Sequence, residues 1–393
     1  MTCAMIGAAP VRVVLALDKF KGSLTAAAAC QAVGAGIRAT SPAVVVDEVP
    51  IADGGDGTLE VLLGHGYLPI EVEASGPTGE RSRPRIGVRG ESAFIELAEV
   101  CGLGRLPGGQ LAALRAGTKG LGEAALAALE AGAASLTVGL GGSASTDGGI
   151  GFLQALGANV RDRGGKACAP GAAGLLEVAS LDLTSLDERA SAADWQLLVD
   201  VESPLCGPLG AAQLFGPQKG LTPGEVGRVE EAMHRWAGLL AEETGRDVSA
   251  VPGAGAAGGT GAALLAVFGG EPRSGSSHVL RQSGLEDRLR SARLLVTGEG
   301  RWDEQTSHGK GPGAALALAQ HLRLPAVIVV GSMADVTLGP EEGVIAVHQL
   351  RDLESDLGRS MAGADRLLME IGRRIGQRLA APTPESASGQ ENW

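Results

Sequence analysis

The sequence predicts an α/β protein built from two domains. Apolar, β-branched runs such as 11–17 alternate with Ala-rich stretches, and this alternation is typical of a buried parallel sheet covered by helices. The 393 residues exceed the usual size of one domain. Residues 1–75 and the last third of the chain share this alternation, whereas the middle begins with short strand-like runs separated by turns. We therefore expect a doubly wound, Rossmann- or flavodoxin-like domain with a second, mixed α/β domain inserted into it.

The N-terminal segment predicts a β-α-β unit. Residues 11–17 form a continuous apolar run, which suits a strand buried on both faces. A polar loop follows, and Ser23 is expected to cap a helix that runs to about residue 39. A second apolar run at 43–49 predicts the next strand, and the Gly-rich loop 50–57 leads from it to a short helix.

The middle of the chain predicts a mixed sheet. Short strand-like runs separated by turns begin after Glu71, at 72–73, 84–88 and 94–97, so a domain boundary is expected near Ser75. Longer elements then follow, namely a helix at 120–131, strands at 135–140 and 195–201, and a helix at 222–244. The last of these begins Thr-Pro-Gly-Glu, which places Pro223 at the first helical position that proline favours.

The C-terminal third returns to the pattern of the N-terminus. Strands are predicted at 294–297, 326–330 and 344–347, and helices at 312–322 and 362–379. We therefore assign residues 1–75 and 286–380 to the doubly wound domain and residues 76–285 to the inserted one. The tail 381–393, rich in Pro, Ser, Glu and Gln, is expected to be disordered.

Composition excludes several classes of partner. The net charge of -12 disfavours a nucleic-acid-binding face and an acidic membrane surface. No apolar stretch reaches the roughly 18 to 20 residues of a membrane helix. The five cysteines are scattered and lack a C-x-x-C pair, which argues against a disulfide framework. The start of the chain does not resemble a signal peptide. We expect a cytoplasmic monomer or homodimer without nucleic-acid or membrane partners.

Two polar loops near the N-terminus carry candidate binding groups. Lys19 and Lys21 lie between the first strand and the first helix, where a helix start favours an anion. Asp53 and Asp56 lie in a Gly-rich turn after the second strand, and their carboxylates suit a hard cation such as Mg²⁺. The alternatives without a binding role are a solvated turn for the first loop and an Asx-type turn for the second.

Two Gly-rich loops in the middle of the chain suit phosphate groups. Segment 139–149 contains the G-x-G-x-x-A spacing of dinucleotide folds, but no acidic residue ends a strand at the expected distance, so a phosphate or carboxylate cradle is the preferred interpretation. Segment 252–261 has no charge and offers only backbone N–H groups, as an anion-binding nest does. A flexible linker is the alternative for this second segment.

Two further segments bring charged side chains to strand ends. Asp200 ends a predicted strand, and Lys219 lies in the rigid Pro/Gly loop 215–220, where it is either a phosphate ligand or an ordinary surface lysine. Segment 297–312 is the densest polar cluster, with Glu299, Arg301, Asp303 and Lys310 after a buried strand. Arg301 suits bidentate binding of a carboxylate. The chain has no Walker A segment and no protein-kinase signature set.

These segments, in this order, resemble the bacterial type 1 glycerate kinase family. The matching stretches are 18–24, 52–58, 141–144, 215–220, 252–259 and 297–310, and the resemblance covers the chain from Val11 to about Leu379. It implies ATP- and Mg²⁺-dependent phosphorylation of (R)-glycerate, with 2-phosphoglycerate as the expected product. It also implies two α/β domains, one inserted in the other, with the site in the cleft between them. The sequence departs from the family's usual residues at Lys19, Asp56, Thr146, Trp302 and 202–203.

The chemistry of phosphoryl transfer then assigns roles to the candidate residues. The catalytic candidates are Asp200 as the base toward the C2 hydroxyl, with Lys21 and Lys219. Glycerate is assigned to Lys19, Ser23, Arg301 and Glu299, and the ATP phosphates to Gly141, Gly142, Ser143, Gly255, Gly258, Gly259 and Lys310. Asp53 and Asp303 are assigned to Mg²⁺. The alternative functions are an NAD(P)-dependent hydroxy-acid dehydrogenase and a non-catalytic protein that binds small carboxylates.

Overall fold

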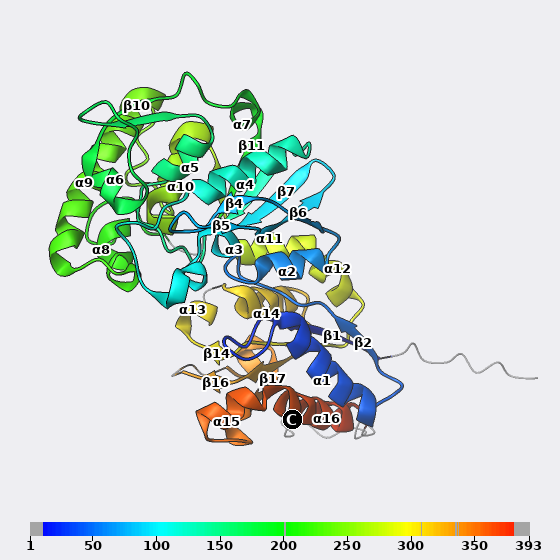
Figure 1. Cartoon of the computed structure of the whole chain (residues 1–393). Helices are drawn as coiled ribbons and strands as arrows, with labels where there is room; N and C mark the ends of the chain where they lie inside the picture. The colour runs from blue at the N-terminus through cyan, green and yellow to red at the C-terminus, as the bar shows by residue number, and fades with distance from the viewer. Residues whose placement is uncertain (1–10, 200–201, 308, 335, 337, 381–393) are drawn as a thin grey trace, which may run out of the picture. The chain divides into compact units, whose positions relative to one another are not determined.

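The computed structural model of the chain describes residues 11–199, 202–307, 309–334, 336 and 338–380 (Figure 1). The predictions made for the first ten residues, Asp200 and the tail 381–393 lie outside these residues. Contacts divide the chain into unit 1, Met1–Asp53 with Val279–Trp393, and unit 2, Gly54–His278. Within the part of the chain that the structure describes, no helix is long and apolar enough to cross a membrane.

Unit 1 is built on a five-stranded parallel sheet in the order β17-β15-β13-β1-β2. The strands are β1 (Arg12–Leu17), β2 (Val45–Glu48), β13 (Leu294–Gly298), β15 (Ala326–Val330) and β17 (Val344–Gln349). The strand that follows β1 in the sequence extends the sheet on one side, and the strands that follow β13 extend it on the other side. The boundary between β1 and β13 is therefore the point where strand order reverses, and in open α/β sheets ligands bind beyond the carboxyl ends of strands at such a point.

Helices cover both faces of this sheet. Alternate residues of β1 enter two separate cores, since Val13 and Leu15 pack with α1 and α16, whereas Val14 and Ala16 pack with α12 and α14. The helices of unit 1 are α1 (Ala26–Thr40), α12 (Leu285–Arg290), α13 (Glu304–Ser307), α14 (Gly311–His321), α15 (Leu357–Ala362) and α16 (Ala364–Ala380). A two-stranded pair, β14 (Arg301–Trp302) with β16 (Ser332–Met333), completes the unit. The predicted α/β class with a parallel sheet is confirmed.

Helices α1 and α16 lie side by side and approach closely because glycines face the contact (Figure 1). A Cβ atom on Gly372 would lie 2.2 Å from the carbonyl oxygen of Val33, and one on Gly36 would lie 2.1 Å from that of Met369. Backbone atoms cannot move aside as a flexible side chain can, so the two helices would have to separate.

We therefore expect Gly372→Ala to lower the free energy of unfolding of unit 1 by about 1–3 kcal/mol, the usual cost of overpacking. Chemical denaturation monitored by circular dichroism measures the effect. Gly358→Ala on exposed α15 is the matched control, because the nearest atom to its Cβ would lie at an ordinary 3.5 Å. A Gly372→Ala protein as stable as the control would contradict the close packing of α1 and α16.

Unit 2 contains a six-stranded mixed sheet in the order β12-β11-β8-β7-β6-β3. The four strands from β12 to β7 run parallel, while β6 and β3 are antiparallel to their neighbours. The strands of this sheet are β3 (Leu68–Glu71), β6 (Arg85–Arg89), β7 (Ser92–Glu96), β8 (Ser135–Gly139), β11 (Asp194–Leu198) and β12 (Glu271–Arg273). Two small pairs are β4 (Ala74–Ser75) with β5 (Arg81–Ser82), and β9 (Asn159–Asp162) with β10 (Val178–Asp182). The mixed sheet predicted for the middle of the chain is present.

The helices of unit 2 bury a large core against this sheet. They are α2 (Thr58–Leu63), α3 (Leu97–Cys101), α4 (Lys119–Glu130), α5 (Ile150–Ala155), α6 (Gly171–Glu177), α7 (Glu188–Ala192), α8 (Ala211–Phe215), α9 (Pro223–Thr244) and α10 (Ala256–Phe268). Helix α11 (Gly275–Gln282) spans the division between the units. Helix α9 begins as predicted, with Thr222 and Glu225 forming a capping box and Pro223 in the first turn.

Three local expectations differ from the structure. Helix α1 is capped by Thr25, whose hydroxyl accepts from Ala28 N, and not by Ser23, because Ser23 donates its own hydroxyl to the carbonyl oxygen of Met361. The strand predicted at 72–73 lies earlier, at β3, which is exposed at the sheet edge where a proline is tolerated. The units divide at Gly54 and Val279 and not near Ser75 and residue 285, because β3 pairs with β6 and α2 packs on the same sheet.

Candidate active site

Carboxylates gather in unit 1 at the carboxyl ends of its central strands. Asp18 follows β1 directly and donates its backbone N–H to the carbonyl oxygen of Gly298, the last residue of β13. Glu299 follows β13, and Asp53 follows the segment after β2, whose Ile51 N–H bonds to the carbonyl oxygen of Leu17. The ends of β13, β1 and β2 therefore bring together residues that are far apart in the sequence, as expected where strand order reverses.

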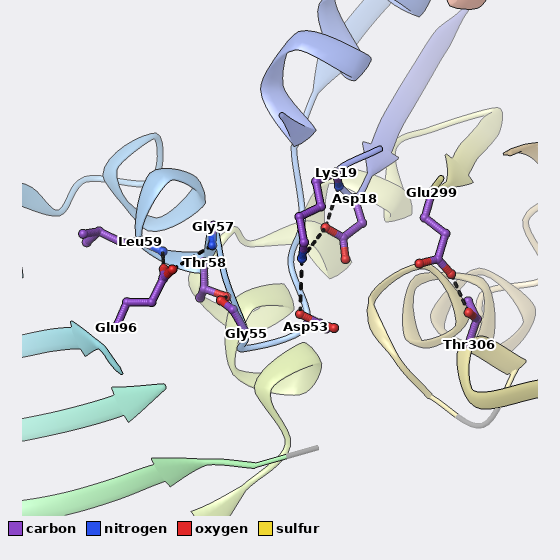
Figure 2. A network of polar contacts seen from close by, with 10 residues as sticks. All are labelled: Asp18, Lys19, Asp53, Gly55, Gly57, Thr58, Leu59, Glu96, Glu299 and Thr306. Atoms are coloured by element: carbon purple, nitrogen blue, oxygen red, sulfur yellow. Dashed lines mark hydrogen bonds and ion pairs between the residues drawn. The ribbon is translucent and has the colours of Figure 1, made fainter. Parts of the chain in front are cut away.

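Lys19 links two of these carboxylates (Figure 2). Its ammonium nitrogen lies 3.9 Å from Oδ1 of Asp18 and 3.7 Å from Oδ1 of Asp53. The backbone N–H of Lys19 also donates to Oδ1 of Asp18, at 2.6 Å. Asp18 is only 4% exposed, so it is held in a fixed position rather than solvated.

Burial changes the proton affinity of these carboxyl groups. It raises the pKa of Asp18 to about 6, and the charge of Asp53 adds to this rise while Lys19 opposes it. Burial likewise raises the pKa of Glu299 to about 7, and the charges of Asp18, Asp303 and Asp53 raise it further. The Glu299 carboxylate accepts a hydrogen bond from the Thr306 hydroxyl (Figure 2). The charges of Asp18, Asp53 and Asp303 therefore all act on Glu299.

The cations predicted for this region lie on adjacent loops. The loop after β1 and the loop after β13 touch, since Gly300 N donates to the carbonyl oxygen of Lys19 at 3.4 Å. Lys21 is exposed on the first of these loops and Arg301 is exposed at the start of β14, and no ion pair of either is found among the residues that the structure describes. Lys310 precedes α14 and donates to the side-chain oxygen of Gln305 at 2.9 Å. Lys310 belongs to unit 1, whereas the Gly-rich segments that were predicted to bind the ATP phosphates together with it belong to unit 2.

Asp303 and Ser23 have local partners in the structure. Oδ1 of Asp303 accepts from the backbone N–H groups of Gln305 and Thr306, at 3.0 and 3.2 Å, so this carboxylate orders the start of α13. Ser23 holds Met361 on α15 through its hydroxyl. Oδ1 of Asp303 therefore shapes its own loop, and Ser23 ties the loop after β1 to α15.

Three Gly-rich or polar segments meet in unit 2. A Cβ atom on Gly141 would lie 2.7 Å from Cα of Gly55, and one on Gly258 would lie 2.1 Å from the carbonyl oxygen of Ser145. The segments 54–58, 139–149 and 255–259 are thus in backbone contact, and Gly148 N donates to the carbonyl oxygen of Gly258 at 2.9 Å. A side chain at Gly141 or Gly258 would prevent this packing, and Ala257, Gly258 and Gly259 all have positive φ angles at the start of α10.

Lys219 enters the same group of loops. It is 3% exposed, and its ammonium nitrogen donates to the carbonyl oxygen of Ser145 at 2.6 Å. The alternative of an ordinary surface lysine is therefore wrong. Burial lowers the pKa of Lys219 to about 8, and the charge of Asp147 partly opposes this. The structure thus brings Lys219 together with the loops that contain Gly141, Ser143 and Gly258.

Two buried carboxylates that the sequence analysis missed hold these loops in shape. Glu96, at the end of β7, accepts from the backbone N–H groups of Gly57 and Leu59 at 2.8 and 2.7 Å (Figure 2), and burial raises its pKa to about 7. Asp147 accepts from the hydroxyl and N–H of Thr118 and from Gly149 N. Asp147 could have been found from its position inside a Gly-rich loop, but nothing in the local sequence marks Glu96.

Asp18 was also given no role in the sequence analysis, although it directly follows a buried strand. That position was a usable signal, because the first residue after a parallel strand lies at the edge where ligands bind. Asp200, the predicted base, lies outside the described residues.

An α/β fold with carboxylates and cations at the carboxyl ends of parallel strands, and with packed Gly-rich loops around a buried lysine, contains the groups that a phosphotransferase, a kinase with an alcohol acceptor, requires. A sequence model described as the glycerate kinase family matches residues 13–380. The chain therefore belongs to the glycerate kinase family.

Individual relatives agree with this assignment. The chain is 35% identical over 374 residues to the glycerate 2-kinase of Escherichia coli strain K12, covering 94% of this chain and 98% of that protein. It is 34% identical to a glycerate kinase of Halalkalibacterium halodurans, covering 92% of this chain and 97% of the relative. A crystal structure assigned as glycerate kinase 2 from Salmonella typhimurium LT2 has a TM-score of 0.82 and 37% identity, covering 94% of this chain and 98% of that one.

Proposed function

We propose that this protein transfers the γ-phosphoryl group of ATP to glycerate, with (R)-glycerate as the acceptor and 2-phosphoglycerate as the product. The observation that carries the proposal is the carboxylate cluster of Asp18, Asp53, Glu299 and Asp303 in a member of a kinase family. The family relationship argues against the dehydrogenase alternative. The predicted place of the reaction, a cleft between two domains, stays a prediction.

No three carboxylates of this cluster lie within 4.8 Å of one another among the described residues, so we propose that a divalent cation draws them together on binding. The donors of the cluster are oxygen atoms, which Mg²⁺ prefers, and burial raises the pKa of Glu299, with a further rise from the charges of Asp18, Asp303 and Asp53. Asp53 is the first candidate to hold Mg²⁺, and Asp303 and Asp200 are further candidates from the sequence. When bound, Mg²⁺ supplies charge neutralisation for the phosphate oxygens of ATP.

Lys21 and Arg301 are the groups that we assign to the carboxylate of glycerate. Both are exposed cations next to the carboxylate cluster, and the residue before Arg301 contacts the loop that contains Lys21. A guanidinium group can bind a carboxylate through two parallel hydrogen bonds, which would fix the orientation of the small substrate. Lys19, already paired with Asp18 and Asp53, instead keeps these carboxylates in position.

Asp18 is the described group best placed to take the proton of the glycerate hydroxyl. Its pKa of about 6 lies close to neutral pH, where a general base is most effective. A Cβ atom on Gly311 would lie 3.0 Å from Oδ2 of Asp18, so glycine at the start of α14 leaves this carboxylate undisturbed. The prediction that Asp200 is the base is tested in the same experiment as the role of Asp18.

The Gly-rich loops of unit 2 and Lys219 are the groups that we assign to the ATP phosphates. Free N–H groups in loops and at helix starts bind phosphate oxygens, and a buried ammonium group attracts them strongly because little water screens its charge. The segments around Gly141, Ser143 and Gly258 are packed into one rigid group, which supports this role.

Incubation of the purified protein with ATP, Mg²⁺ and (R)-glycerate tests the proposed function. We expect ADP release that depends on glycerate, and a ³¹P NMR spectrum of 2-phosphoglycerate as the product. (S)-Glycerate and lactate serve as acceptor controls, and removal of Mg²⁺ by a chelator should abolish turnover. ADP release that is the same without glycerate would refute the acceptor, and a 3-phosphoglycerate spectrum would refute the position of transfer.

A further inference from the structure

Three side chains with metal-binding atoms meet in unit 2, outside the groups assigned above. Cys206 lies in the loop before α8, and Glu230 and His234 lie one turn apart on α9. The Cys206 sulfur, a Glu230 oxygen and a His234 ring nitrogen all lie within 4.8 Å of one another. Across the ranges that the structure describes, this is the only such group of three or more potential ligands.

Only one of the two oxygen atoms of the Glu230 carboxylate has a hydrogen-bond partner among the described residues. Its Oε1 accepts from Gly207 N at 2.6 Å and lies 3.4 Å from Nε2 of His234. Its Oε2 is buried and has no hydrogen-bond partner among the described residues. The side chain is 12% exposed, so solvent does not compensate for the missing partner. A buried carboxylate oxygen without a donor is costly, and a bound cation would remove that cost.

The surroundings of the thiol are negatively charged. A carboxylate oxygen of Glu230 lies within 4.8 Å of the Cys206 sulfur. The other three cysteines of the described residues, Cys30, Cys101 and Cys168, are all buried. Cys206 is thus the described thiol that a solvent ion can reach, and the charge around it attracts a cation.

We propose that Cys206, Glu230 and His234 bind a divalent transition-metal ion of the Zn²⁺ type, with water as the fourth ligand. Sulfur, imidazole nitrogen and carboxylate oxygen are the ligands of protein-bound zinc, whereas Mg²⁺ prefers oxygen ligands alone. Binding releases the proton of Cys206 to solvent, so that the sulfur coordinates as a thiolate. His234 is 62% exposed and can turn its ring toward the ion without disturbing the core.

The bound ion would fasten the loop 203–210 to helix α9. This loop already supports the Gly-rich segment before α10, because the carbonyl oxygen of Ser203 accepts from Gly253 N and Gly255 N. It also leads through α8 to Lys219. The proposed metal site therefore stabilises unit 2 and does not depend on the proposed function.

Titration of Zn²⁺ and Co²⁺ into protein free of tags and treated with a chelator tests the site. We expect one Zn²⁺ per chain by calorimetry, a thiolate-to-Co²⁺ charge-transfer absorption band, and a higher midpoint of thermal unfolding with Zn²⁺. Cys206→Ser and His234→Gln should each weaken Zn²⁺ binding by about 100-fold or more, since loss of a mere supporting partner costs roughly 10- to 100-fold. Cys206→Ser should also remove the Co²⁺ band.

Cys168→Ser and His321→Gln are the matched controls, and Cys3→Ser tests the cysteine outside the described residues. All three should bind Zn²⁺ as the unaltered protein does. His234 is exposed, so His234→Gln is expected to fold normally. Absence of binding in the unaltered protein, or a Cys206→Ser or His234→Gln protein that binds Zn²⁺ with unchanged affinity, would overturn the proposal.

Discussion

Replacing Asp18 with Asn is expected to lower kcat by about 10²- to 10⁴-fold, the usual contribution of a general base. Asn has almost the same volume, and its side-chain oxygen can still accept from Lys19 N, as Oδ1 of Asp18 does at 2.6 Å. The substitution therefore removes the proton acceptor and one negative charge but leaves the packing intact. Steady-state ADP formation at saturating ATP and glycerate measures the effect.

The pH dependence separates a base from a structural carboxylate. A base acts only when deprotonated, and the pKa of Asp18 is raised to about 6, so kcat/KM should rise as pH increases through about 6. This acidic limb should disappear in Asp18→Asn. Asp287→Asn, a change to an exposed carboxylate of the same unit, should retain both rate and limb. If Asp18→Asn keeps the rate and Asp200→Asn loses it, the base is Asp200, as the sequence analysis predicted.

Replacing Lys219 with Met is expected to lower kcat by about 10²- to 10³-fold, as loss of one preorganised electrostatic group does. Met preserves most of the apolar length of the side chain in a site that is 3% exposed. It removes the charge that we assign to the ATP phosphates and the hydrogen bond to the carbonyl oxygen of Ser145. The rate is measured with ATP varied at saturating glycerate.

An alkaline limb tests whether the charge of Lys219 matters. Burial lowers the pKa of this lysine to about 8, so in the unaltered protein kcat/KM for ATP should fall as pH increases through about 8, where the ammonium group of the free enzyme loses its proton. Lys219→Met should lack this limb. The control is Lys166→Met in the exposed 163–167 turn, which should not change the profile. A Lys219→Met protein with a normal rate and a retained limb would show that Lys219 only supports the loop.

Local sequence patterns predicted most of the secondary structure because their signals are local. The apolar run before Asp18 is β1, and the Thr-Pro-Gly-Glu start of the long helix is the capping box of α9. The cap of α1 was misplaced because Ser23 bonds to Met361, a residue distant in sequence. The unit boundary was misplaced for the same kind of reason, since only strand pairing shows that β3 belongs with β6.

Part of the candidate site could be predicted in the same way. The polar residues found at strand ends included Lys19, Asp53 and Glu299, which all lie in unit 1. Lys19 forms an ion pair with Asp53, and the charge of Asp53 adds to the rise that burial causes in the pKa of Glu299. Gly-rich segments gave the loops around Gly141 and Gly258. Glu96 could not be found, because it acts through backbone N–H groups of a loop that is remote in sequence.

The sequence by itself determined which segments are strands, helices and Gly-rich loops, and the resemblance in their order indicated the family. Only the tertiary structure decided that β1 lies between β13 and β2, and this order places Asp18, Asp53 and Glu299 at one edge. It also decided which charges are buried, as Lys219 and Asp18 are, and which oxygen of Glu230 lacks a partner. The physical reason is that periodicity and turn signals depend on neighbours in the chain, whereas proton affinity and ligand sets depend on neighbours in space.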